Sequence, residues 1–225
     1  MRQTEFSSLE NMSQALCAVV IQNLRNAIDE KGMASLVLSG GRTPETYLPI
    51  LFAAPLTWTK VNITLSDERW VPPNHPDSNE GLVRRFMPPS VAKKVSFTSL
   101  WVDDMSLSDA EYEVEKRLSE ISQPFDCAIL GMGEDGHFAS LFPATQSALS
   151  QKRQCLAVEN TPSYPRMSLS PNRLISTRNI HLCVTGAKKM DVLEQAKKSG
   201  DPDELPIRIL LTSPTIDNLL VYAMK

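Results

Sequence analysis

The sequence lacks the features that would direct it to a membrane, a metal ion or a nucleic acid. No apolar run approaches the roughly 18 residues that a membrane-spanning helix needs. Residues 1–14 have no apolar signal core, so we expect a cytoplasmic protein. The 4 cysteines are widely spaced and form no C-x-x-C pair, so we expect small buried side chains rather than metal or redox ligands. Lysine and arginine are scattered along the chain, which argues against a nucleic-acid partner.

The chain also lacks an excess of positive charge. Its formal net charge of −3 means that the overall field does not attract an anion. A ligand that carries phosphate would therefore need a local cluster of cations and backbone amides. The length of 225 residues and the 42% hydrophobic content suit one globular α/β domain.

Apolar segments with helical spacing alternate along the chain with short, almost continuous apolar segments. The helical pattern predicts helices over 9–28, 44–53, 79–87, 108–121 and 187–198, and the short runs predict strands over 35–38, 61–65, 126–130, 155–158, 180–184 and 219–223. Uninterrupted apolar strands are typical of a parallel sheet that is covered on both faces. No repeat or linker divides the sequence. We therefore expect residues 1–225 to form a single doubly wound α/β domain with a mostly parallel, Rossmann-like sheet flanked by helices.

Ligands of such sheets bind beyond the carboxyl ends of the strands, so the loops that follow strands are the informative ones. The first is SGGRTP, residues 39–44. Gly40 and Gly41 allow a sharp turn, and Thr43 is the expected N-cap of the next helix. Free amides at the helix start, together with Arg42, would favour an anion. An ordinary capped turn explains the same residues equally well.

The second informative loop spans residues 65–81 and begins with three consecutive charges, Asp67, Glu68 and Arg69. A run of charges usually marks a solvated surface, but a strand end in this architecture faces the ligand crevice. The prolines that follow predict an extended segment. We expect His75, which lies among them, to be a surface residue.

The third loop contains a match to the dinucleotide-binding fingerprint. GMGEDG, residues 131–136, fits G-x-G-x-x-G after a predicted strand, and Glu159 follows about 20 residues later. However, Glu134 and Asp135 would repel a pyrophosphate. Pro143 limits any helix after the loop to less than two turns. A nicotinamide-dependent oxidoreductase is therefore a minor alternative.

The same loop places an acid beside a histidine, which indicates proton transfer. An imidazole has an ordinary pKa near 6.5 and can gain and lose a proton at neutral pH. A carboxylate such as that of Asp135 can fix its tautomer and stabilise its charged form. His137 could equally be a turn residue with no chemical role, and the local residues leave both interpretations open.

Five segments together resemble the 6-phosphogluconolactonase family, within the group that also includes glucosamine-6-phosphate deaminase. They are SGGRTP, SDERWVPPNHPDSNEG, LGMGEDGHFASLFP, PRMSLS and VTGAKK, in this order between residues 39 and 189. The resemblance implies a glucosamine-6-phosphate deaminase-like fold and a carboxylic ester hydrolase. The implied reaction converts 6-phospho-D-glucono-1,5-lactone to 6-phospho-D-gluconate in the oxidative pentose phosphate pathway. The resemblance implies no metal and no cofactor, and we expect a small-molecule partner and a monomer or weak homo-oligomer.

The resemblance also assigns residues to roles. His137 matches the family histidine that activates the attacking water, and Asp135 and Asp67 are the candidate carboxylates of the catalytic group. Which of the two supports His137 stays open. The residues expected to bind substrate, mainly its phosphate, are Gly40, Gly41, Arg42, Thr43, Arg69, Arg166 and Lys189.

Two alternatives follow from the same resemblance. The deaminase branch reads DGH-x-A-F-N-E-P, and this chain has Phe142 at the position of that glutamate. Lactone hydrolysis does not need the missing acid, whereas an aldose–ketose isomerisation does. Asp67 matches the proton-abstracting residue of the deaminases, and its role in a hydrolase stays open. The second alternative is a sugar-phosphate-binding module without catalysis, in which GEDGH would have no role.

Overall fold

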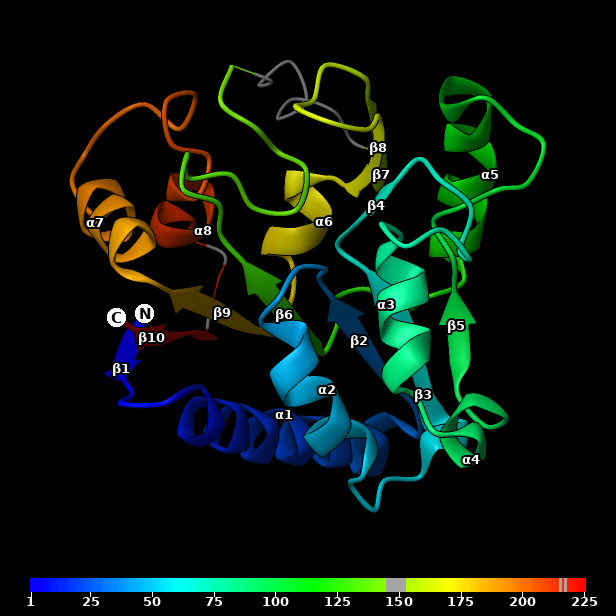
Figure 1. Cartoon of the computed structure of the whole chain (residues 1–225). Coiled ribbons are helices and arrows are strands. Elements are labelled where there is room, and N and C mark those ends of the chain that lie inside the picture. The colour runs from blue at the N-terminus through cyan, green and yellow to red at the C-terminus, as the bar shows by residue number, and fades with distance from the viewer. Residues whose placement is uncertain (145–152, 215, 217) are drawn as a thin grey trace.

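The computed structural model describes residues 1–144, 153–214, 216 and 218–225 (Figure 1). Its centre is a seven-stranded sheet in the order β1-β10-β9-β6-β2-β3-β5, and each described pairing of neighbours is parallel. The strands are β1 (Arg2–Glu5), β2 (Ala34–Leu38), β3 (Val61–Leu65), β5 (Ser96–Thr98), β6 (Cys127–Gly131), β9 (Asn179–Thr185) and β10 (Asn218–Met224). The predicted parallel, doubly wound sheet is confirmed.

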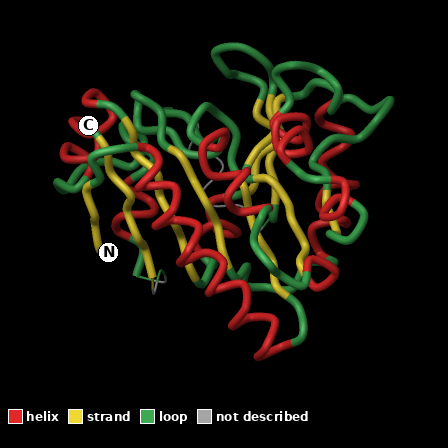
Figure 2. The backbone as a smooth tube through the Cα atoms, turned by 60° about the horizontal axis from the view of Figure 1, so that its bottom comes forward, coloured by secondary structure: helices red, strands yellow, loops and turns green. Residues whose placement is uncertain are grey.

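Helices cover both faces of this sheet. They are α1 (Leu9–Lys31), α2 (Pro44–Phe52), α3 (Asn79–Phe86), α4 (Pro89–Ala92), α5 (Leu107–Ser119), α6 (Pro171–Ile175), α7 (Ala187–Ala196) and α8 (Arg208–Thr212). In Figure 1, α1 lies below the sheet, and α6, α7 and α8 lie above it. Figure 2 shows the long α1 running diagonally across the strands. This helix runs three residues past the predicted end and is capped by Gly32, whose φ of 81° is the left-handed conformation that glycine adopts readily.

A second, smaller sheet was not expected. It is antiparallel and has the order β4-β8-β7, with β4 at Asp67–Arg69, β8 at Arg166–Leu169 and β7 at Cys155–Val158. The strand predicted over 155–158 is therefore real, but its place in the main parallel sheet is wrong. A short apolar run indicates that a segment is buried and extended, but it does not indicate which strand will pair with that segment.

One helix starts earlier than predicted, and one predicted N-cap makes no side-chain bond to its helix. The hydroxyl of Ser106 accepts from the backbone N–H of Asp109, so α5 begins at Leu107, one residue before the range predicted from the sequence. Thr43 precedes α2, but it has helical φ and ψ angles and its hydroxyl accepts no bond from the helix. That hydroxyl instead lies 3.4 Å from the hydroxyl of Thr185. The hydroxyl of Ser78 caps α3 by accepting from the N–H of Gly81, and α3 begins at Asn79 as predicted.

The proline-rich segment after β4 is folded into turns rather than extended. The N–H of His75 donates to the carbonyl of Pro72 at 2.8 Å, and the N–H of Ser78 donates to that of His75 at 3.1 Å. Proline fixes only φ, so the chain can still turn at the next torsion. The His75 ring packs edge-on against Tyr164, with 5.7 Å between ring centroids.

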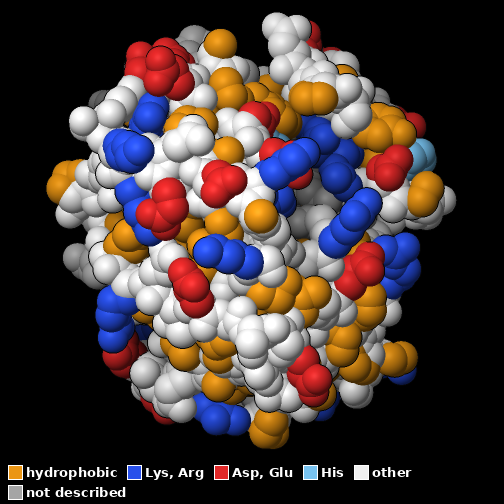
Figure 3. All heavy atoms as spheres, turned by 60° about the vertical axis from the view of Figure 1, so that its left-hand side comes forward, with side chains coloured by type: hydrophobic (Ala, Val, Ile, Leu, Met, Phe, Trp, Pro, Cys, Tyr) orange, Lys and Arg blue, Asp and Glu red, His pale blue; other side chains and the backbone are white. Residues whose placement is uncertain are grey.

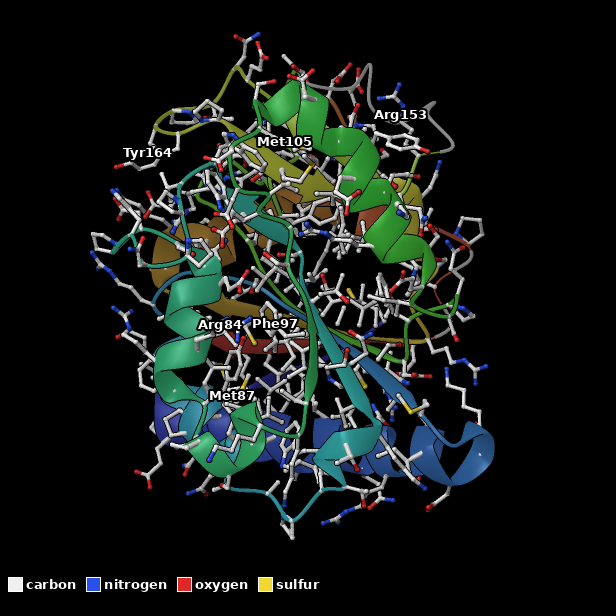
Figure 4. All side chains as sticks on the ribbon, turned by 90° about the vertical axis from the view of Figure 1, so that its right-hand side faces the viewer. Arg84, Met87, Phe97, Met105, Arg153 and Tyr164 are labelled. Carbon is white, nitrogen blue, oxygen red and sulfur yellow. The ribbon has the colours of Figure 1, made fainter. Side chains whose placement is uncertain are left out.

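The edge strand β5 is covered by a side chain from α3. The guanidinium carbon of Arg84 lies 4.5 Å from the ring centroid of Phe97, which Figure 4 shows from the side of this edge. All 4 cysteines are free and buried in the core, as expected. Among the described residues, no helix is long and apolar enough to cross a bilayer.

Candidate active site

A cavity of about 350 Å³ opens beyond the carboxyl ends of β2, β3, β6 and β9. Of the predicted site residues, the structure places all but one in its lining: Gly40, Gly41, Arg42, Thr43, Asp67, Arg69, His137, Arg166 and Lys189. The exception, Asp135, lies directly behind His137. Loops that are far apart in the sequence meet here because the carboxyl ends of parallel strands share one edge of the sheet.

His137 and Asp135 form a close pair. The imidazole Nδ1 lies 2.5 Å from Oδ1 of Asp135, and the backbone N–H of His137 donates to the same oxygen at 3.2 Å. Burial acts to raise the pKa of Asp135, but the hydrogen bonds and the charge of His137 outweigh it, and the pKa lies below its usual value. Of the two candidate carboxylates, it is Asp135 that contacts the histidine. This contact leaves Nε2 as the ring nitrogen that can act on a ligand in the cavity.

The loop that carries this pair folds back on itself. The N–H of Gly133 donates to the carbonyl of His137 at 2.9 Å, and a Cβ at Gly133 would lie 2.2 Å from atoms of the His137 ring. On its other side, the ring of Phe142 lies 4.6 Å from the imidazole, centroid to centroid. The described residues from 132 to 144 contain no helix, so the match to the dinucleotide fingerprint lacks the helix N-terminus that binds pyrophosphate.

Asp67 points inward rather than to solvent. It is 6% exposed, and its Oδ1 accepts from the hydroxyl of Ser66 at 2.8 Å. Its Oδ2 accepts from the hydroxyl of Ser140 at 2.6 Å and lies 3.8 Å from Nη1 of Arg166. Asp67 and Arg69, the first and last residues of the charge run, therefore face the cavity. Sequence reasoning missed Ser140, because a serine inside an apolar segment carries no distinctive pattern.

The neighbouring Glu68 is fully buried and supports the cavity wall. Its carboxylate accepts from the backbone N–H groups of Asn79 and Glu80, at the start of α3, and from the hydroxyl of Ser78. The N–H of Arg69 donates to it as well. Burial raises the pKa of Glu68 to about 7, and these four hydrogen bonds limit the rise. In the sequence, Glu68 is only the middle residue of a run of charges. Such a run does not distinguish an acid with a structural role from one with a functional role.

Part of the cavity lining offers donors that have no other partner among the described residues. In the described part of the chain, neither Arg42 nor Lys189 makes a side-chain hydrogen bond or an ion pair. The backbone N–H groups of Gly40 and Gly41 likewise donate to no described residue. A Cβ at Gly40 would lie 1.8 Å from the side-chain oxygen of Asn79, so only glycine fits between the loop and α3. Figure 3 shows lysine and arginine side chains gathered around a hollow on one face of the molecule.

Arg69 and Arg166, which also line the cavity, lie on two segments that are bonded to each other. The N–H of Trp70 donates to the carbonyl of Pro165 at 2.8 Å, and the hydroxyl of Tyr164 donates to the carboxylate of Asp77 at 3.0 Å. Arg69 donates to the backbone carbonyl of Asp77 at 2.7 Å, which fixes its guanidinium at the cavity. The cavity therefore has a cationic rim, an aspartate–histidine pair and a floor of buried hydrogen bonds. This combination suits proton transfer on an anionic ligand.

Comparisons with known proteins identify the group to which these features belong. The family model described as "Glucosamine-6-phosphate isomerases/6-phosphogluconolactonase" matches residues 7–220. A 6-phosphogluconolactonase of Pseudomonas putida is 39% identical over 217 residues, which cover 93% of this chain and 89% of the relative. The crystal structure of a 6-phosphogluconolactonase from Shewanella baltica OS155 has 32% identity and a TM-score of 0.94, and the match covers 100% of this chain and 98% of that one. A monomeric glucosamine-6-phosphate deaminase has a TM-score of 0.80 at 16% identity, with coverage of 100% and 98%, and shares the fold.

Proposed function

Because the chain belongs to the glucosamine-6-phosphate isomerase and 6-phosphogluconolactonase family, we propose that it hydrolyses 6-phospho-D-glucono-1,5-lactone to 6-phospho-D-gluconate. It is then a lactone hydrolase of the oxidative pentose phosphate pathway. The observation that carries the proposal is the pairing of His137 with Asp135 at the edge of a cavity that also presents Arg42 and Lys189.

In the proposed reaction, His137 acts as general base. Asp135 holds Nδ1, and Nε2 removes a proton from water as the water oxygen attacks the lactone carbonyl carbon. The resulting imidazolium then donates that proton to the ring oxygen as its bond to the carbonyl carbon breaks. A lactone is an activated ester, so a positioned base that contributes about 10²- to 10⁴-fold is sufficient.

The substrate phosphate binds at the wall with free donors. The amides of Gly40 and Gly41 and the side chains of Arg42 and Lys189 are all available there. Each charge-assisted hydrogen bond contributes about 1.5–3 kcal/mol, so three or four can hold a dianion in a protein of negative net charge. Arg69, Arg166 and Thr43, which line the same cavity, complete the binding group.

We further propose that residues 1–225 act as one domain in the cytoplasm, as a monomer or a weak homo-oligomer. One continuous hydrophobic core joins the main sheet, the small sheet and the helices, which supports a single domain. Four buried free thiols are typical of proteins kept in a reducing compartment.

The deaminase alternative is disfavoured by Phe142. This side chain is 8% exposed and packs on His137 where an isomerisation would need a second acid. The binding-module alternative leaves the paired His137 and Asp135 without a function.

The test is the rate at which freshly generated 6-phosphogluconolactone is consumed. Micromolar protein should accelerate it above spontaneous hydrolysis, and His137→Ala should lower turnover at least tenfold while binding of 6-phosphogluconate persists. Binding of 6-phosphogluconate by the wild-type protein without any acceleration would favour the module and exclude the hydrolase.

A further inference from the structure

Ser140 links the loop that carries the histidine to the floor of the cavity. The residue is fully buried and lies three positions after His137. Its hydroxyl donates to Oδ2 of Asp67 at 2.6 Å, and its backbone N–H donates to the hydroxyl of Ser168 at 3.3 Å. Ser140 is thus held from two strands of the small sheet, β4 and β8, while His137 stands at the cavity edge.

Asp67, which accepts the hydrogen bond from Ser140, has partners on both of its carboxylate oxygens. Asp67 also accepts from Ser66 through its other oxygen and faces Arg166 at 3.8 Å. Both oxygens of this buried carboxylate accept hydrogen bonds from hydroxyl groups. The carboxylate therefore holds its neighbours in place and is not a free base. The three bonded groups come from the end of β3, from β8 and from the loop after β6, so Asp67 ties together three separate segments.

The short stretch between His137 and Ser140 couples the positions of these two residues. Ala139 has a φ of 49°, the left-handed conformation that a residue with a Cβ adopts only when its surroundings impose it. Leu141 donates through its N–H to the carbonyl of Phe138 at 3.0 Å and closes a tight turn around this alanine. A displacement of Ser140 is therefore passed to His137, which is one residue outside the turn.

We propose that Ser140 is a positioning residue of this site: its bond to Asp67 fixes the loop that places His137 against the substrate. The part of the proposal that concerns turnover rests on the proposed function. The proposal also assigns a role to Asp67. Its carboxylate holds the loop that carries His137 in place, through Ser140, and takes no proton from substrate.

Ser66 offers a matched control. It is equally buried and donates its hydroxyl to the same carboxylate, but it directly follows β3, and among the described residues no hydrogen bond joins it to the loop that carries His137. Ser140→Ala should lower kcat at least tenfold, because small displacements of a catalytic group cost large factors in rate. The Kd for 6-phosphogluconate should stay within about twofold. Ser66→Ala should lower kcat no more than about threefold, and Ser140→Thr, which keeps the hydroxyl, should recover most of the kcat lost in Ser140→Ala.

Hydrogen exchange provides a readout that does not depend on turnover. Amides in the segment 133–141 should exchange at least fivefold faster in Ser140→Ala than in the wild type, and at nearly the wild-type rate in Ser66→Ala. Equal losses of kcat in the two alanine variants, or unchanged exchange in this segment, would overturn the positioning role. A wild-type protein without lactone turnover would overturn the proposed function alone, since the exchange comparison would still decide whether Ser140 fixes the loop.

Discussion

Adding one methyl group at Gly133 should disable the site without unfolding the protein. In Gly133→Ala the new Cβ would lie 2.2 Å from Cε1 and Nδ1 of His137 and 2.6 Å from Oδ1 of Asp135. Ordinary contact begins near 3.4 Å, so the imidazole must move by about 1.2 Å. A misplacement of about 1 Å can cost on the order of 100-fold in rate. We therefore expect kcat to fall about 100-fold. The clash involves side chains that can rotate, so the thermal midpoint should change by only a few degrees.

Gly131 supplies the control within the same segment. A Cβ there would meet nothing within 4 Å, and its φ is not positive. In Gly131→Ala we expect kcat to stay within about threefold of the wild type. Both variants would be compared by steady-state lactonase kinetics and by thermal unfolding. Wild-type kcat in a folded Gly133→Ala protein would mean that His137 does not depend on this contact, and the assignment of the Asp135–His137 pair would then be wrong.

Two further predictions concern the phosphate and the response to acid. Lys189→Ala should lower kcat/KM for the phosphorylated lactone at least tenfold but leave the rate with unphosphorylated glucono-1,5-lactone nearly unchanged; equal losses on both would exclude a phosphate contact. Burial lowers the pKa of His181 to about 4 in the folded protein, against 6.5 as its ordinary value. The folded state thus binds fewer protons than the unfolded state between these values, and stability present above pH 6.5 is lost as the pH falls towards 4. A pKa difference of this size corresponds to about 3 kcal/mol in the free energy of unfolding. Denaturant unfolding of His181→Asn should therefore show a much smaller loss of stability between pH 7 and pH 4 than the wild type does. Identical pH profiles for the two proteins would contradict the prediction.

The parts of the molecule that were predictable from the sequence are those governed by local pattern. The strands at 61–65 and 180–184 are short, mostly apolar segments, and such segments are buried where they pair. Because parallel strands end at one edge, their following loops had to meet, and this brought Arg42, His137 and Lys189 to one cavity.

The parts that were not predictable depend on partners far away in the sequence. Nothing near Asp67 indicates that Ser140 will donate to it, since 73 positions separate them. The strand at 155–158 joined the small sheet because its partner, residues 166–169, follows it closely and pairs in antiparallel fashion. The choice between Asp67 and Asp135 as the partner of His137 likewise required three-dimensional distances, because both acids follow strands and both suit the chemistry.

The two loops joined by Tyr164 and Asp77, and by Trp70 and Pro165, have a consequence for binding. Because these segments hold each other before any ligand arrives, little conformational entropy remains to be lost when the substrate enters. Affinity then depends on the charges that Arg69 and Arg166 already present rather than on ordering of the loops. Departure of the product is then opposed by its attraction to the cationic rim, and added salt should accelerate it.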